Sequence, residues 1–301
     1  MDFTLTEAQR ELAALTRKIL DSSDTPWLDL VKSGVVPESP DELGVLEQCA
    51  VLVELGRAVS DVPYLPTVVA TTALASFGTP EQRSSEPGTV LSVALVETDG
   101  VLTTVPAASE AAAFLVAQGS QVFYVRADQA SVTGQELVDG SDAGTFAFTG
   151  GEEVPGLTPE WLTARYTVGL CAFQLGVCER ALELTAEYAR TRVQFDRPIG
   201  SFQAVAQRLA DAYVDVAAIR LTLWQAAWRL AEGLDATEEI ATAKFWAADA
   251  GHRVAHTAVH VHGGTGIDMS HEVHRYFTAA KRAEFELGGA TAQLLKLSAA
   301  W

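Results

Sequence analysis

Residues 192–203 read RVQFDRPIGSFQ, and this short stretch decides how the rest of the chain is interpreted. Helical periodicity ends before it and begins again after it, so the stretch connects two long helices. Arg192, Phe195 and Gln203 place a cation, an aromatic ring and an amide within this connection. Residues 259–266, VHVHGGTG, give a second signal, because a later helix there breaks into glycines. Together the two stretches suit a dinucleotide that lies across the end of a helical bundle.

The glycines of the second stretch have two interpretations. A dinucleotide fingerprint of the GxGxxG type follows a strand and opens a helix, whereas Gly263 and Gly264 follow a helix. Taken alone, a left-handed residue that ends the helix is the simpler explanation. Three glycines within four residues nevertheless permit a ligand to approach the backbone closely.

The charge of the chain restricts its partners. With 39 acidic and 21 basic residues, the formal net charge is −18. This balance argues against nucleic acid as a partner, because phosphate binding needs clustered cations. Arg190, Arg192 and Arg197 nevertheless fall within eight residues of one another. An anionic ligand explains this cluster, and so do cations that offset the dipole at a helix end.

Composition predicts a globular protein without a membrane span. The chain has 301 residues, of which 48% are hydrophobic and 20% charged. No run of 18 apolar residues occurs, and the first residues show no secretory signal. Cys49, Cys171 and Cys178 form no disulfide or metal pattern. Because a sparse, odd cysteine count fits a reducing compartment, we expect a cytoplasmic protein.

Periodicity divides the chain into three regions. Residues 1–84 predict an N-terminal helical domain that begins at a capping box in residues 6–9, TEAQ. Residues 85–156 contain short β-prone runs between turn residues, which predict a small, shortened antiparallel β domain. Residues 157–301 predict a bundle of four long helices, the last of which runs from residue 270 to the C-terminus. The expected fold class is therefore α+β and mostly α.

The histidines raise the question of a metal site. All six lie between residues 252 and 274, and His252, His256 and His260 share one helix face. This spacing occurs in zinc and copper sites, but no HExxH or Glu-x-x-His pattern accompanies it. A polar stripe at an interface is the simpler interpretation, so we predict no metal site. No G-x-S-x-G nucleophile elbow is present either.

Three segments in a fixed order carry a resemblance to a known family. They are residues 190–205 (RTRVQFDRPIGSFQAV), 258–267 (AVHVHGGTGI) and 275–281 (RYFTAAK), with further likeness at residues 54–57 (ELGR). In this order they resemble the acyl-CoA dehydrogenase family, most clearly over residues 160–301. The resemblance implies an N-terminal helical domain, a middle β domain and a C-terminal four-helix bundle.

The resemblance also implies FAD as the cofactor. In this family FAD lies between subunits: the β domain of one holds the isoalloxazine ring, and the bundle of its neighbour holds the pyrophosphate and adenosine. By position, Arg192 would pair with the pyrophosphate, Phe195 would pack on the cofactor and Gln203 would hydrogen-bond to it. His260 stands where the family often has glutamine. The implied cofactor-binding set is Arg192, Phe195, Gln203, His260, Gly263 and Gly264.

A catalytic residue is not found where the resemblance places one. The family uses a glutamate to remove the α-proton of an acyl-CoA while a hydride leaves the β-carbon for the flavin. Most members carry it near the last helix, at a position that is Leu287 here. Glu286 is adjacent, but one helical residue is a rotation of about 100°, so Glu286 would serve only if the register slips. A second family location, residues 164–168 (ARYTV), contains no carboxylate, and Glu160 comes too early.

The β region also shows no counterpart of the Thr/Ser run that contacts the flavin ring in the family. The chain thus resembles the non-catalytic subunit of a heterotetrameric (α2β2) acyl-CoA dehydrogenase. This resemblance implies a catalytic homologue as partner, an acyl-CoA substrate of bulky or steroid-derived type, and an electron-transfer flavoprotein as acceptor. Two alternatives stay open: a self-sufficient homo-oligomeric dehydrogenase, and a non-enzymatic helical scaffold or metal-binding bundle.

Overall fold

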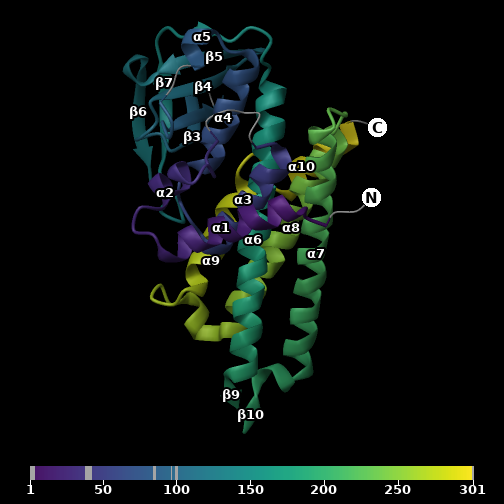
Figure 1. The fold of residues 1–301 in the computed structure, drawn as a ribbon. Helices are drawn as coiled ribbons and strands as arrows, with labels where there is room; N and C mark the ends of the chain where they lie inside the picture. Colours follow the sequence, from purple (N-terminus) through teal and green to yellow (C-terminus); the bar gives the residue numbers. More distant parts are fainter. Residues whose placement is uncertain (1–3, 38–42, 84–85, 96, 99–100, 300–301) are drawn as a thin grey trace. The chain divides into compact units, whose positions relative to one another are not determined.

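A computed structural model describes residues 4–37, 43–83, 86–95, 97–98 and 101–299 (Figure 1). The chain divides into two compact units. The helical unit contains residues 4–5, 52–60 and 170–299 of the described chain, and the sheet unit contains residues 6–51 and 61–169. The division falls inside two helices, so each of them contributes to both units. The predicted boundary at residues 84 and 85 lies outside the described residues, and the three-domain division stays a prediction.

The helices of the sheet unit begin at the predicted capping box. Thr6 Oγ1 accepts a hydrogen bond from the Gln9 backbone N–H at 3.2 Å, and Gln9 Oε1 accepts one from the Thr6 N–H at 3.0 Å. Two backbone donors that a helix leaves unpaired at its start are thereby satisfied. The helices are α1 (Glu7–Ser22), α2 (Pro26–Lys32), α3 (Val45–Ala58), α4 (Tyr64–Phe77) and α5 (Pro80–Arg83).

Two four-stranded sheets form the β region. Their strand orders are β1-β4-β5-β8 and β2-β3-β7-β6. The pairings are antiparallel as predicted, except that β1 runs parallel to β4, because the chain passes through the other sheet between them. The elements are β1 (Leu91–Ala94), β2 (Glu97–Thr98), β3 (Val101–Pro106), β4 (Ala113–Gln118), β5 (Gln121–Arg126), η1 (Ala127–Gln129), β6 (Ala130–Gln135), β7 (Ala143–Phe148) and β8 (Glu152–Glu153).

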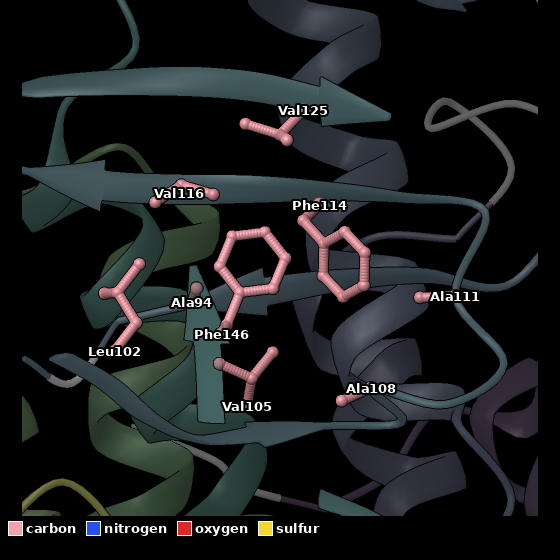
Figure 2. Close-up of a cluster of buried hydrophobic side chains, with 9 residues drawn as sticks. All are labelled: Ala94, Leu102, Val105, Ala108, Ala111, Phe114, Val116, Val125 and Phe146. Atoms are coloured by element: carbon pink, nitrogen blue, oxygen red, sulfur yellow. The ribbon is translucent and has the colours of Figure 1, made fainter. Parts of the chain in front are cut away.

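The β region has a closely packed core of its own (Figure 2). Phe114 from β4 and Phe146 from β7 meet with ring centroids 4.5 Å apart. Because successive strand residues point to opposite faces, the inward residues of both sheets gather around these rings. The other members of the cluster are Ala94, Leu102, Val105, Ala108, Ala111, Val116 and Val125. Side chains of this one chain therefore fill the space between its two sheets.

The helical unit contains the predicted bundle, with one difference. Its elements are α6 (Pro159–Thr191), β9 (Val193–Gln194), β10 (Arg197–Pro198), η2 (Ile199–Ser201), α7 (Gln203–Ala231), α8 (Thr237–His262), η3 (Gly263–Ile267), α9 (Val273–Phe285) and α10 (Ala290–Ala299). The single last helix that was predicted is two helices, because Leu287 and Gly288 have φ angles of 60° and 94°, which a right-handed helix does not tolerate. The predicted end of that helix at residue 301 lies outside the described residues.

Two glycines allow α3 and α6 to cross in near contact. A Cβ on Gly56 would lie 2.0 Å from the Phe173 carbonyl oxygen, and one on Gly176 would lie 1.9 Å from the Val53 carbonyl oxygen. Backbone therefore packs on backbone at this crossing, as only residues without a side chain permit. The predicted fold class, mostly α with a small, largely antiparallel β region and C-terminal helices, is confirmed.

Candidate functional site

The connection between α6 and α7 is a tight hairpin at the tip of this helix pair (Figure 1). Strands β9 and β10 are joined by Phe195 and Asp196, whose φ angles are 52° and 64°. A two-residue turn with both φ angles positive matches the twist of a hairpin. Aspartate tolerates this left-handed conformation, whereas phenylalanine is strained there. The side chain of Phe195 is 86% exposed. The backbone thus holds an aromatic ring out in solvent.

Three arginines of this region differ in their surroundings. Arg190 pairs with Glu187 at 2.6 Å, and the Arg197 guanidinium lies 4.1 Å from the centroid of the Phe202 ring. The backbone of Arg192 is well bonded, since its N–H donates to the Tyr188 carbonyl at 2.8 Å. Its exposed side chain has no ion-pair or hydrogen-bond partner in the described part of the chain. Arg192 is the cation left available to an anion.

Gln203 lies at the start of α7, where a helix attracts negative charge. It is the first residue of this 29-residue helix, and its side chain is exposed. The preceding residue, Phe202, has no side-chain acceptor to cap the first turn. The unpaired N–H groups and the positive end of the helix dipole therefore face solvent beside Gln203.

The glycine turn after α8 contains glycines of three kinds. Gly263 has φ 62° and ψ −136°, a conformation that other residues avoid, so its own backbone requires glycine. A Cβ on Gly266 would lie 2.7 Å from the Val259 carbonyl oxygen, so packing requires glycine there. At Gly264 φ is not left-handed and a Cβ would meet no atom within 4 Å. Among the residues that the structure describes, nothing accounts for glycine at this position.

An aromatic stack joins the two predicted stretches. The ring of Tyr188, one turn before Arg192, lies on the ring of His262, with centroids 4.3 Å apart and planes 24° apart. The end of α6 is thereby fixed against the end of α8, immediately before Gly263. Sequence reasoning did not select Tyr188 or His262, although His262 directly precedes Gly263 and Tyr188 lies four residues before Arg192. His260 and Gly264 are exposed at the same end of α8.

His262 is expected to make the helical unit sensitive to acid. It is buried, its Nδ1–H donates to the Ala258 carbonyl at 2.8 Å, and burial lowers the pKa of its ring. In the unfolded chain the ring has its ordinary pKa of about 6.5, so below that pH the unfolded chain binds more protons than the folded chain. The free energy of unfolding therefore decreases as the pH falls from about 6.5 through the lower pKa of the folded state.

We expect His262→Phe, which keeps an aromatic ring against Tyr188, to lose less stability than the wild type when the pH falls. Urea unfolding at pH 7.5 and pH 5 measures it. His260→Phe, which alters an exposed residue, is the control. If the wild type and His262→Phe lose the same stability on acidification, His262 is not the sensitive group.

The histidine stripe on α8 belongs to a different cluster. His252 and His256 have ring centroids 4.3 Å apart, and His252 Nδ1 lies 3.1 Å from Glu284 Oε1 on α9. The Lys281 ammonium lies 2.5 Å from the same carboxylate. Within the described residues, no group of three or more His, Cys, Asp or Glu side chains could hold a metal ion. The stripe instead forms an ion-pair cluster between two helices.

The residues near the expected catalytic base lie at the other end of α9. Glu286 Oε2 is 3.2 Å from Arg282 Nη1, and the Glu286 side chain is only 7% exposed. Leu287 follows in the left-handed turn, and buried Gln293 donates from Nε2 to the carbonyls of Leu287 and Gly288 at 3.1 and 3.0 Å. Since α9 has 13 residues, its axis is about 20 Å long. The glycine turn comes before the start of α9, whereas this turn follows its end.

A buried lysine supports the same turn. Lys244 on α8 is fully buried, and its Nζ donates to the carbonyls of Ala283 and Glu284 at 3.0 Å each. These are last-turn carbonyls of α9, which lack partners within the helix. Burial lowers the pKa of Lys244. Lys244 and Gln293 together hold the backbone around Leu287 in one conformation.

The buried cysteines are not candidates for nucleophilic chemistry. Cys171 and Cys178 are both buried in α6. Burial raises the pKa of Cys171 to about 12 and also raises that of Cys178. Because the thiolate is the reactive form, both thiols are inert near neutral pH.

Comparison with known proteins identifies the family. Residues 164–300 match the model of the acyl-CoA dehydrogenase C-terminal domain. Acyl-CoA dehydrogenase FadE27 of Mycobacterium tuberculosis is 45% identical, and the match covers 99% of this chain and 98% of the relative. The chain belongs to the acyl-CoA dehydrogenase family. FadE28 of the same organism is a more distant relative in this family, at 30% identity over 99% of this chain and 98% of its own length.

Solved structures agree with this membership of the acyl-CoA dehydrogenase family. A chain in the crystal structure of the ChsE4-ChsE5 complex from Mycobacterium tuberculosis matches with a TM-score of 0.90 and 44% identity, over 99% of this chain and 98% of that one. A variant of the Tcur3481-Tcur3483 steroid ACAD also has a TM-score of 0.90, at 33% identity and 98% coverage of both chains. In the described part of the chain, no helix combines the length and apolarity needed to cross a bilayer.

Proposed function

We propose that the chain is a subunit of an FAD-dependent acyl-CoA dehydrogenase and supplies the pyrophosphate and adenosine half of the FAD site to a catalytic homologue. The observation that carries this proposal is the unpaired, exposed Arg192 beside the uncapped start of α7, in a chain with leucine at the expected base position. FAD, when bound, supplies the acceptor for the hydride that leaves the acyl β-carbon. The residues of this chain bind and orient the anionic end of that cofactor.

The residues present suit the anionic end of FAD. Arg192 offers a guanidinium that no carboxylate of the described chain neutralises, and charge-assisted hydrogen bonds to phosphate are among the strongest available to a side chain. The start of α7 adds backbone donors and a favourable dipole beside Gln203. Phe195 presents an exposed ring for packing, and the open space above Gly264 permits close approach.

The turn at Leu287 supports a non-catalytic role for this chain. A leucine side chain accepts no proton, and the neighbouring Glu286 is held by Arg282 rather than directed to solvent. Buried Lys244 and Gln293 hold this turn from both sides, so a shift of register there would break four hydrogen bonds. The proton acceptor of the reaction therefore comes from the partner.

The β region supports the same division of roles. In the family, a Thr/Ser run of this region contacts the flavin ring, and the lack of a counterpart here favours a partner chain as the holder of that ring. The assembly that follows is an α2β2 heterotetramer with one FAD for each pair of chains.

The substrate class follows from the relatives. One similar structure is described as a steroid ACAD. We therefore propose acyl-CoA thioesters of bulky, steroid-derived type as substrates, an electron-transfer flavoprotein as electron acceptor, and the cytoplasm as the location. The reaction removes a proton from the α-carbon and a hydride from the β-carbon, which leaves an α,β-unsaturated thioester.

The proposal is tested by purifying the chain alone and after co-expression with an acyl-CoA dehydrogenase homologue from the same genome. We expect the lone chain to lack both flavin and turnover, and the co-expressed pair to carry one FAD for every two chains. A lone chain with full flavin occupancy and turnover would instead establish the self-sufficient homo-oligomer.

Gly264→Ala is expected to separate cofactor binding from stability. Its methyl group would meet no atom of the described residues within 4 Å, so the free energy of unfolding should stay the same or rise by about 0.5 kcal/mol. In the co-expressed pair, the methyl group should obstruct the cofactor and weaken FAD binding about tenfold, or about 1.4 kcal/mol. Fluorescence titration of apoprotein with FAD measures this. Equal FAD affinity in variant and wild type would remove Gly264 from the site.

Glu286→Gln distinguishes the proposal from a self-sufficient enzyme. We expect turnover of the co-expressed pair to stay within about twofold of wild type, because Glu286 is paired with Arg282 and does not reach substrate. Loss of the charged hydrogen bond should cost about 1–3 kcal/mol of stability. Steady-state kinetics with saturating acyl-CoA gives the answer, and a thousandfold loss of turnover would make Glu286 the base.

A further inference from the structure

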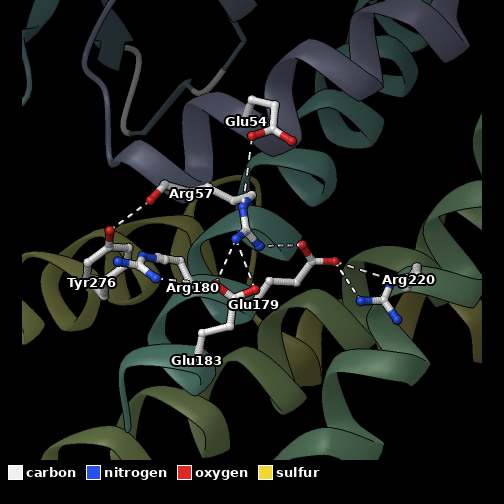
Figure 3. Close-up of polar contacts among 7 residues, drawn as sticks. All are labelled: Glu54, Arg57, Glu179, Arg180, Glu183, Arg220 and Tyr276. Carbon is white, nitrogen blue, oxygen red and sulfur yellow. Dashed lines mark hydrogen bonds and ion pairs between the residues drawn. The ribbon is translucent and has the colours of Figure 1, made fainter. Parts of the chain in front are cut away.

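Five arginines of the described chain are partly buried, and four of them have a carboxylate partner. Figure 3 shows how such a partner is provided: the guanidinium of Arg57 lies 3.0 Å from Glu179 and 2.7 Å from Glu183. Arg180, Arg229 and Arg282 pair with Glu183, Glu239 and Glu286, at 3.4, 3.3 and 3.2 Å. The guanidinium of the fifth, Arg165 on α6, forms no ion pair or hydrogen bond with any described residue.

Helix spacing explains why Arg165 finds no counter-ion on its own helix. A helical side chain meets the residues three and four positions away. None of the four residues at these positions around Arg165 carries a charge. They are Trp161, Leu162, Val168 and Gly169. Burial lowers the pKa of Arg165, and among the described residues only the Cys49 thiol acts against this. No carboxylate of the described chain therefore offsets the charge of Arg165.

Arg57 shows the opposite outcome. Burial also opposes its charge, yet its hydrogen bonds and charge interactions with Glu183 and Glu179 prevail and raise the pKa of the guanidinium. A charge taken out of water costs free energy unless a counter-ion accompanies it. At Arg57 the chain offsets this cost with its own carboxylates, and at Arg165 it does not. In a chain with 39 acidic and 21 basic residues, this difference points to a counter-ion from outside the chain.

The guanidinium of Arg165 is supported by aromatic rings. It lies 4.4 Å from the centroid of the Trp161 ring, one turn earlier on α6. The Trp161 ring in turn meets the ring of Phe77 on α4 edge to face, with centroids 5.5 Å apart. A guanidinium over a ring is attracted to its face, while its N–H groups stay available to an anion. Both rings are only partly buried, so an apolar surface adjoins these donors.

A second donor in the sheet unit lacks an acceptor. The Tyr64 hydroxyl, at the start of α4, is fully buried and has no hydrogen-bond partner among the residues that the structure describes. Burial raises the pKa of Tyr64, and the Cys49 thiol adds to this. Cys49 on α3 thus lies within electrostatic reach of both Tyr64 and Arg165. Because buried donors are nearly always paired, this surplus of donors suits a ligand that only accepts hydrogen bonds.

We propose that Arg165, supported by Trp161, binds the carboxylate of a small acid with an apolar body, such as a medium-chain fatty acid. A carboxylate accepts without donating, and its two oxygens match the parallel N–H groups of a guanidinium. The apolar body of the ligand lies on the partly exposed rings of Trp161 and Phe77. These residues belong to the sheet unit, whereas Arg192, like the other residues proposed for FAD, belongs to the helical unit. The site is therefore independent of the proposed function.

Calorimetric titration of the full-length chain with octanoate tests the site. Octan-1-ol has the same apolar chain without the charge, and inorganic phosphate has charge without the chain. We expect octanoate to bind at least about tenfold more tightly than either. Arg165→Met should weaken octanoate binding at least about tenfold and leave octan-1-ol binding unchanged. Arg180→Met is the matched control, because it removes a partly buried arginine of the same helix that is already paired.

Thermal unfolding of the ligand-free chain separates a binding residue from a structural one. Arg165→Met removes a desolvated charge that has no partner among the described residues, so the melting temperature should stay the same or rise. Arg57→Met takes a cation from Glu179 and Glu183, so it should lower the melting temperature.

Three results would overturn the proposal. The first is a wild-type chain that binds octanoate no better than octan-1-ol. The second is an Arg165→Met chain that melts at a lower temperature and binds octanoate as the wild type does, which would make Arg165 structural. The third is an Arg165→Met chain with unchanged octanoate binding and weaker assembly with a co-expressed homologue, since the carboxylate would then come from a partner chain.

Discussion

Gly176→Ala is expected to lower the free energy of unfolding of the helical unit by about 3 kcal/mol. The new methyl carbon would lie 1.9 Å from the Val53 carbonyl oxygen and 2.8 Å from the Arg57 backbone nitrogen. Both are backbone atoms, so no side-chain rotation relieves the clash and α3 must move away from α6. That movement also pulls Arg57 away from Glu179 and Glu183. The higher helix propensity of alanine, about 1 kcal/mol, offsets only part of this loss.

Urea denaturation followed by circular dichroism measures the effect. Gly264→Ala is the matched control, since the same methyl group there meets no atom within 4 Å. The two variants differ in what surrounds the added methyl group, and the stability difference between them isolates the cost of the helix crossing. A Gly176→Ala variant as stable as Gly264→Ala would show that α3 and α6 do not cross in backbone contact.

Arg192→Ala is expected to weaken FAD binding to the co-expressed pair by about 10- to 100-fold. A hydrogen bond to a charged group contributes about 1.5–3 kcal/mol, and 1.4 kcal/mol corresponds to a factor of ten. Arg192 suits this role because its exposed guanidinium has no partner among the described residues. Dialysis of the loaded complex, followed by flavin absorbance, measures the remaining FAD.

Arg190→Ala is the control for charge. It removes the same positive charge two residues away, but Arg190 is already paired with Glu187. We expect this variant to retain FAD as the wild type does, and both variants to assemble normally with the homologue. Equal FAD loss from the two variants would indicate a general field effect, and no loss from Arg192→Ala would remove this residue from the FAD site.

Local patterns were sufficient to predict much of this protein. The capping box at Thr6 was confirmed, since it depends on atoms three residues apart. The ordered segments around Arg192, His260 and Lys281 were sufficient to recognise the family. The break at Leu287 was missed, because the hydrophobic periodicity of α9 continues into α10. The break itself lies in the backbone of Leu287 and Gly288, whose φ angles are positive.

The sequence by itself determined the order of helices and strands, the family and the residues that suit a cofactor, because these depend on short spacings and on side-chain chemistry. Only the tertiary structure decided which of those residues are available. It paired Arg190, left Arg192 exposed, enclosed Glu286 beside Arg282, and stacked Tyr188 on His262. The stack of Tyr188 on His262 joins segments far apart in the chain, so no local pattern contains it. The pairs of Arg190 and Glu286 lie within single helices, but spacing alone does not decide which of several neighbouring charges pair and which stay exposed.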